Sequence, residues 1–123
     1  TSLEDVVKKI KVTEPNTIIG LRDGVLPALA LLAGCQLDIF TPLSAGPMTA
    51  EQLAEAAGLG SGKLRPLLYA LVSTGLLILD NDYFQNSDEA TQYLVRGSSA
   101  YMGNALVAWS SRWERVLSTA DSI

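Results

Sequence analysis

The amino-terminal third of the chain contains two different apolar patterns. In residues 3–10 the apolar positions are spaced i, i+3, i+4 and i+7, which predicts a short helix that ends at Pro15. Between residues 18 and 40, apolar side chains instead cover nearly all faces of a helix, and no charge occurs from residue 24 to 37. We expect two helical pieces in this second stretch, with Pro27 near the start of the second piece.

A capping box marks the next helix. Thr49 is placed to cap it, and Gln52 stands at the third helical position, where its side chain can reach back to the cap. Gly58 is expected to end the helix, because a helix often closes with a left-handed residue. The predicted inner stripe consists of Leu53, Ala56 and Ala57.

The following helix is amphipathic and runs toward Gly75. Ser61 or a close neighbour is its expected cap, and Gly75 its expected end. Because proline is tolerated only near the first turn of a helix, Pro66 predicts a late start. The apolar stripe, spaced i, i+3, i+4, i+7 and i+8, consists of Leu64, Leu67, Leu68, Leu71 and Val72.

The period changes after residue 75, which predicts a small β-hairpin. Residues 76–79 and 83–85 are short β-prone runs, and the Asp-Asn-Asp sequence between them makes the turn. Ser87 caps a further helix, and a last helix begins near Ala100. The fold class that follows is mainly α, with a winged-helix module over about residues 25–86. One face of the last helix carries Met102, Leu106, Trp109, Trp113, Val116 and Leu117.

Residues 57–64 read AGLGSGKL and raise the question of a phosphate or cofactor loop. A Walker loop would need a glycine where Ala57 stands and a hydroxyl residue where Leu64 stands. A dinucleotide loop fails as well, because its third glycine would come one residue early and a strand should precede it. We therefore interpret this stretch as a turn between two helices.

Composition limits the chemistry further. The chain has 123 residues, is 48% hydrophobic and carries a net charge of −4, which suits one folded domain. It has no histidine, so triads, Cys–His pairs and most metal sites are excluded, and we expect no catalytic, cofactor-binding or metal-binding residue in it. A single cysteine, Cys35, favours the cytoplasm. The longest charge-free run has 15 residues, so no membrane span is expected.

A winged-helix transcription regulator is the main competing interpretation. The second helix of a helix-turn-helix often enters the major groove, and here it offers only Lys63 and Arg65 near its start. The hairpin tip carries two carboxylates where a DNA-binding wing needs cations. Nine basic residues against thirteen acidic ones do not supply a patch for phosphates.

The helices at 24–40 and 100–117 carry more apolar surface than the central module can cover. Two coverings remain open: a second copy of the chain, or a domain that follows it. Intertwined helical dimers bury more than about 2,000 Å², as obligate interfaces do.

The order of these pieces resembles a known family. ALALLAGCQLDIF, GPMTAEQLAEAAGL, LRPLLYALVSTGLL, a hairpin and NSDEATQYLVRGSSAYMG, followed by a tryptophan-containing helix, are similar to the amino-terminal dimerisation region of S-adenosylmethionine-dependent O-methyltransferases. The resemblance covers nearly the whole chain and is strongest over residues 28–103. It implies an arm over 1–24, a winged-helix-like dimerisation domain over 25–95, and a helix over 96–123 that leads to a catalytic domain.

The resemblance also implies a function. The chain would form a homodimer through its N-terminal and C-terminal helices and shape the pocket for a small, often aromatic, acceptor, binding neither nucleic acid nor membrane. S-adenosylmethionine would bind to the following domain, so this part would be inactive by itself. A stand-alone dimer module is a further alternative. Asn104 and Ser110 are polar candidates for orienting a ligand, and the candidate pocket residues are Tyr101, Met102, Leu106, Trp109 and Trp113.

Overall fold

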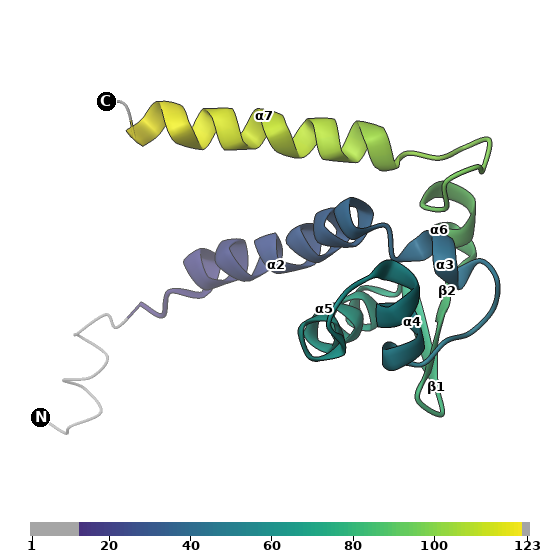
Figure 1. The fold of residues 1–123 in the computed structure, drawn as a ribbon. Coiled ribbons are helices and arrows are strands. Elements are labelled where there is room, and N and C mark those ends of the chain that lie inside the picture. Colours follow the sequence, from purple (N-terminus) through teal and green to yellow (C-terminus); the bar gives the residue numbers. More distant parts are fainter. Residues whose placement is uncertain (1–12, 122–123) are drawn as a thin grey trace, which may run out of the picture.

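A computed structural model of the protein describes residues 13–121, with side chains described as far as Ser118. The helix expected over residues 3–10 lies outside the described part of the chain. The fold is mainly helical with one small antiparallel sheet, as the sequence predicts (Figure 1). Its elements are α2 (Asn16–Leu37), α3 (Phe40–Leu43), α4 (Ala50–Ala57), α5 (Ser61–Thr74), β1 (Leu77–Asp80), β2 (Tyr83–Asn86), α6 (Asp88–Tyr93) and α7 (Gly103–Asp121).

The middle elements, from α3 to α6, form a compact unit around one apolar core. Each element contributes side chains to this core, because each has apolar residues at the spacing of its own structure. The strands pair with Leu79 opposite Phe84, and Phe84 is buried against the helices. The largest fully buried side chains are Ile39, Phe40, Leu53, Leu68, Leu71, Leu77 and Phe84.

The residues predicted from the sequence to cap or end helices do so in the structure. The Thr49 hydroxyl accepts from the Gln52 amide N–H at 3.2 Å, and the Gln52 side chain accepts from the Thr49 N–H at 3.0 Å, which completes the capping box. Gly58 and Gly75 end α4 and α5 with φ of 71° and 86°. Ser87 caps α6 by accepting from the Ala90 N–H at 3.1 Å.

The AGLGSGKL stretch is a turn between helices, as interpreted. Gly58 ends α4, the Leu59 N–H donates to the Ala54 carbonyl at 2.8 Å, and Gly60 is the N-cap of α5. Because a helix and not a strand precedes it, the loop has no backbone arrangement suited to a pyrophosphate.

Three predictions about helix limits and faces were wrong. Residues 16–37 form one continuous helix, because Pro27 removes a single hydrogen bond while the Ala- and Leu-rich residues on either side sustain the others. This helix stops at Asp38, whose φ of 53° is left-handed, and therefore Phe40 begins α3.

The other two errors concern α4 and α5. The latter begins at Ser61, not late, so Pro66 lies in its sixth position, where only the carbonyl of the first turn loses a partner. In α4, Ala54 is buried and Ala56 is exposed, because the helix turns the other side of its apolar stripe toward α5. The last helix also begins slightly later than expected, at Gly103.

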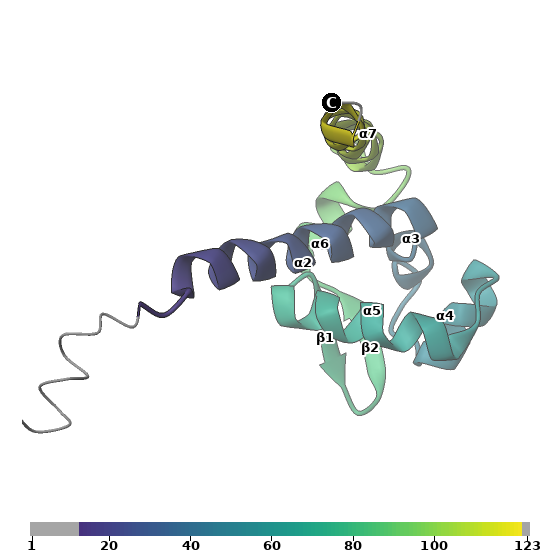
Figure 2. The same ribbon diagram turned by 90° about the vertical axis from the view of Figure 1, so that its left-hand side faces the viewer.

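Two long helices extend beyond the compact unit. Figures 1 and 2 show α2 and α7 leaving the unit on the same side and crossing obliquely. Of the residues of α2, only Ala30, Gly34 and Cys35, all in its carboxyl-terminal half, are buried. The helix also runs without a break across the domain limit expected at residue 24.

The 22-residue helix α2 is long and apolar enough to cross a membrane, by length and composition alone. Its best window has a mean hydropathy of 1.6, and 17% of that window is buried. From the lengths of the charge-free runs, no helix of this kind was expected. Arg22 and Asp23 interrupt the run, but the mean hydropathy of the helix stays high.

Candidate functional site

A groove lies between α2 and α7 and has a volume of about 430 Å³. Both helices run outward from the compact unit, one above the other (Figure 1), and mostly apolar residues of each line the space between them. Its lining is almost entirely apolar. The lining residues are Gly24, Val25, Ala28, Leu29 and Leu32 of α2, and Trp109, Ser110, Trp113, Glu114 and Leu117 of α7.

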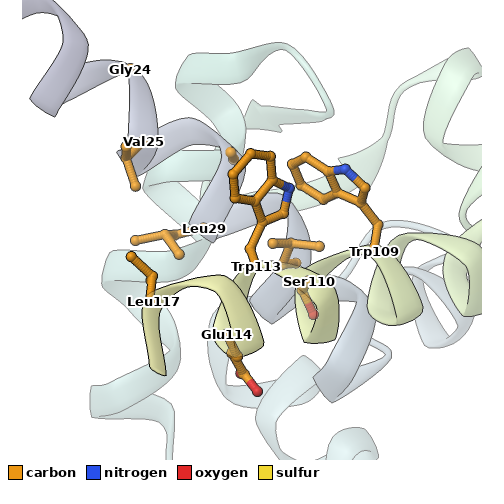
Figure 3. A pocket seen from close by; sticks show the side chains of 10 residues that line it. Gly24, Val25, Leu29, Trp109, Ser110, Trp113, Glu114 and Leu117 are labelled. Carbon is orange, nitrogen blue, oxygen red and sulfur yellow. The ribbon is translucent and has the colours of Figure 1, made fainter. Parts of the chain in front are cut away.

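The two tryptophans dominate the α7 wall. Trp109 and Trp113 are four residues apart, so they lie on the same face of the helix. Their rings meet edge to face, with centroids 5.9 Å apart and planes at 75°. Figure 3 shows both rings projecting from one side of α7 toward α2. The Trp109 and Trp113 residues remain 45% and 53% exposed, so residues 13–121 leave about half of each uncovered.

The α2 wall alternates small residues with large aliphatic ones. Gly24 and Ala28 stand one turn apart, and a Cβ added at Gly24 would meet nothing within 4 Å. Leu29, between the two walls in Figure 3, is 53% exposed. The groove therefore has room for another apolar group against both helices.

Further apolar side chains on both helices continue the exposed surface outside the groove. These side chains are more than half exposed, and no other described residue buries them. They are Ile18, Leu21 and Leu26 on α2, and Val116 on α7.

The groove has few polar side chains. One of them is hydrogen-bonded within its own helix, and another points away from the tryptophans. The Ser110 hydroxyl donates to the Val107 carbonyl at 2.7 Å within its own helix. The Glu114 side chain points away from the indole rings (Figure 3). No group of three metal-ligating side chains occurs among the residues that the structure describes. The groove can bind apolar surface, but its lining offers neither a nucleophile nor a base.

The predicted pocket residues separate into two groups. Trp109 and Trp113 line the groove, together with the polar candidate Ser110. Leu106 packs partly buried against the core, whereas Met102, directly before α7, is 45% exposed. The α2 wall was not among the predicted pocket residues, although the charge-free run over residues 24–37 was its signal.

Tyr101, also predicted for the pocket, belongs to a polar cluster at the base of α7. The nearby Tyr101 hydroxyl, followed by the Asp38 carboxylate, raises the pKa of Arg96. Arg96 Nε lies 3.5 Å from Asp38 Oδ2. This cluster joins the linker before α7 to the end of α2.

Ionisable groups elsewhere have structural explanations. Burial, and then the Asp38 carboxylate, raise the pKa of the Cys35 thiol, which keeps it neutral and unreactive. The Glu51 carboxylate accepts from its own backbone N–H and from Arg65, and both hydrogen bonds lower its pKa. Since Arg65 is paired in this way, one of the two cations at the start of α5 is partly neutralised.

A second, more open hollow lies beside the hairpin tip and has a volume of about 500 Å³. Its lining consists of Pro47, Asp80, Asn81, Tyr83 and Gln85. Asn81 and Asp82 form the two-residue turn with φ of 48° and 65°, the conformation that a type I′ turn requires. The tip is therefore anionic and tightly turned.

No methyl-donor site is formed by residues 13–121. The sheet in this part of the chain is a two-stranded antiparallel hairpin, and the glycine-rich turn follows a helix. A parallel strand that ends in a glycine-rich turn, which brings backbone N–H groups to a nucleotide, is not among the described elements. The residues present therefore do not fit S-adenosylmethionine.

Comparisons with known proteins identify the family of this part of the chain. A sequence profile of O-methyltransferase dimerisation domains matches residues 20–96. The chain is 31% identical over 96 residues to the N,N-dimethyltransferase OxyT of Streptomyces rimosus, covering 78% of this chain and 28% of that protein. It is 34% identical over 90 residues to the tetracenomycin polyketide synthesis 8-O-methyl transferase TcmO of Streptomyces glaucescens, covering 72% of this chain and 26% of that protein.

Solved structures share the fold. An O-methyltransferase family protein from Burkholderia thailandensis superimposes with a TM-score of 0.72 and 26% identity, over 84% of this chain and 31% of that one. Human N-acetylserotonin methyltransferase in complex with SAM gives a TM-score of 0.67 at 20% identity, over 80% of this chain and 30% of that one. The chain thus spans less than a third of the length of these relatives.

Proposed function

This chain belongs to the O-methyltransferase dimerisation-domain family, and on that premise we propose that two copies associate through the apolar faces of α2 and α7. The resulting homodimer would shape the acceptor site of a small-molecule O-methyltransferase. S-adenosylmethionine would bind in a part of the enzyme outside residues 13–121. The proposed division places an arm before residue 25, the dimerisation unit over 25–95, and a connecting helix from 96.

The single observation that carries this proposal is the uncovered groove. Burying one large apolar side chain is worth about 1.5–3 kcal/mol, and soluble monomers rarely leave a continuous apolar patch of more than a few hundred Å² uncovered. Here such side chains follow two helices that lie side by side. A second copy supplies a matching apolar surface without any further partner.

An aromatic acceptor is the substrate class that fits best. Indole rings and aliphatic side chains suit a flat apolar ligand, so the acceptor would lie against the part of these walls that a second copy leaves uncovered. TcmO is named for methylation at an oxygen of a polyketide, and another similar structure was solved with apigenin. We assign Trp109 and Trp113 to the acceptor site, with Tyr101, Met102 and Leu106 as candidates that a second copy or the rest of the enzyme would complete.

The helix-turn-helix and hairpin are proposed to be a winged-helix unit that does not read DNA. The hairpin tip is anionic, and Arg65, near the start of the second helix, is paired with Glu51. Both features oppose phosphate binding. A gel-shift assay tests this alternative: salt-sensitive binding to duplex DNA at submicromolar concentration would favour a transcription regulator.

A protein partner for α2 is favoured over a lipid bilayer. Arg22 and Asp23 lie in the amino-terminal half of the helix, where a membrane core would penalise them. Residues of α2 and α7 line the same groove, so one protein partner could contact both helices.

Sedimentation velocity at micromolar concentration tests the proposal, with a charge placed in the groove as the perturbation. We expect the wild type to sediment as a dimer and Leu29→Asp to sediment as a monomer, because the variant buries an unpaired carboxylate in the interface. Ile78→Asp is the matched control, since Ile78 is 45% exposed on the hairpin, away from both helices, and Leu29 is 53% exposed. A wild type that remains monomeric, or a Leu29→Asp variant that dimerises as well as Ile78→Asp, would contradict the proposal.

A further inference from the structure

The base of the groove is held by a polar cluster that the proposed association does not use. It joins three parts of the chain: Asp38 directly after α2, Thr41 in α3, and Arg96 with Tyr101 in the linker before α7. Thr41 and Arg96 are 55 residues apart in the sequence. The cluster therefore connects the two helices that form the groove walls.

The Thr41 hydroxyl is the centre of this cluster. It donates to Asp38 Oδ1 at 2.6 Å and accepts from the backbone N–H of Arg96 at 3.1 Å. The Arg96 side chain adds a second connection, with Nε 3.5 Å from Asp38 Oδ2. Asp38 is itself fixed in a left-handed conformation, because its N–H donates to the Cys35 carbonyl at 3.2 Å.

Tyr101 carries the connection into α7. Its side chain packs against Gly103, where an added Cβ would overlap the ring and the hydroxyl of Tyr101. The next residue, Met102, donates its N–H to the Tyr93 carbonyl at 2.8 Å. The chain is thus held on both sides immediately before α7 begins.

We infer that Asp38, Thr41, Arg96 and Tyr101 are positioning residues that set the angle at which α7 crosses α2, and so the shape of the groove. Trp113 is ten residues beyond Gly103, about 15 Å along the helix, so a rotation of about 10° at the base would move its backbone by about 2.6 Å. Such a displacement is comparable to the size of a methyl group, and the apolar fit depends on contacts of that scale. The inference concerns groove shape alone and does not require that a second copy is the occupant.

Tryptophan fluorescence reports this shape selectively, because Trp109 and Trp113 are the only tryptophans of the chain. We expect Thr41→Val to shift the emission and to change its quenching by acrylamide, since valine keeps the shape of threonine but removes both hydrogen bonds. Far-UV circular dichroism should stay unchanged. Thr91→Val is the matched control, because the Thr91 hydroxyl donates at 3.0 Å to Ser87, within one turn of the chain.

A double-mutant cycle of Asp38→Asn and Arg96→Met separates positioning from general destabilisation. Asparagine also tolerates the left-handed conformation, so the first variant removes the charge and keeps the backbone. We expect each single variant to change quenching, and the double variant to add little to either. Should one of these variants fail to fold, Tyr101→Phe, which removes only the hydroxyl, and Arg96→Lys provide the same comparison.

The measurements should be repeated in the Leu29→Asp background, where association through the groove is removed. The same spectral changes there would place the effect in the crossing of the helices within one chain. A wild type that proves monomeric would contradict the proposed dimer and leave this test intact. Quenching that is unchanged by Thr41→Val, Asp38→Asn and Tyr101→Phe, or changed equally by Thr91→Val, would overturn the inference.

Discussion

The compact unit and the two crossing helices contain similar apolar residues, but these residues are buried in the first and largely exposed in the second. Between Ile39 and Leu94, the apolar stripes of several short elements face one another, and the largest side chains reach zero or near-zero exposure. In α2 and α7, by contrast, Leu29, Trp109 and Trp113 remain about half exposed. Hydrophobicity alone therefore does not mark a core: whether a residue stabilises the fold or an interface depends on what the chain places opposite it.

The largest difference in stability is expected between a substitution at a core phenylalanine and one at an exposed leucine of α7. Phe40 is fully buried, so Phe40→Ala should lower the free energy of unfolding by about 3–5 kcal/mol at any protein concentration. Leu117→Ala, at a residue 67% exposed, should alter only how the unfolding midpoint depends on protein concentration. Urea titrations at two concentrations check this, and an equal loss from both variants would remove the distinction.

The next effect concerns the tryptophan wall. Trp113→Ala should weaken dimer association by about 2 kcal/mol or more, roughly 30-fold in the dissociation constant, because buried tryptophans commonly dominate interfaces. Tyr83→Ala is a matched control, since Tyr83 is an aromatic residue 45% exposed on the hairpin. Sedimentation equilibrium measures both; similar dissociation constants for the two variants would show that the groove is not the interface.

A glycine where α2 meets the compact unit should have an intermediate effect. A Cβ at Gly34 would lie 2.9 Å from Cε2 of the fully buried Phe40, so Gly34→Ala should destabilise by about 1–3 kcal/mol through overpacking. Gly62 in α5 has nothing within 4 Å of such a Cβ, and Gly62→Ala should instead stabilise by about 0.5–1 kcal/mol. Thermal denaturation distinguishes the two signs. A neutral Gly34→Ala would mean that α2 is held to the unit less tightly than the contacts indicate.

The smallest expected effect is local to α4. Thr49→Ala removes the hydroxyl that accepts from Gln52 N–H, which should cost about 1 kcal/mol. Thr49→Ser keeps this acceptor and should remain close to the wild type. Because α4 belongs to the compact unit, association should not change, and a shift in dimer mass for Thr49→Ala would show that the two regions are coupled.

Sequence patterns predicted those features that depend on neighbouring residues. The capping box of Thr49 and Gln52, the glycines that end α4 and α5, and the Ser87 cap act within one turn of the chain, so they are readable locally. The unbroken helix through Pro27 was missed because proline is a strong local signal for a helix start or end, and the residues on either side of it override that signal here. Ala54 and Ala56 were confused because their burial depends on the position of α5, which α4 does not encode.

The site was only half predictable for the same reason. Trp109 and Trp113 share a helix face, which spacing alone reveals, and the uncovered apolar surplus was also expected. The opposite wall of the groove comes from residues about 80 positions earlier in the chain. Its placement depends on contacts such as Thr41 to Arg96, which no periodicity records.

Simultaneous measurement of mass and tryptophan emission during dilution tests the central claim most directly. If a second copy covers the groove, the mass should fall from about twice 13.1 kDa to that of one chain as the protein is diluted. Over the same concentration range, the emission of Trp109 and Trp113 should shift to the red as the indoles meet water. A constant emission through the change in mass, or a single-chain mass at all micromolar concentrations, would contradict the claim.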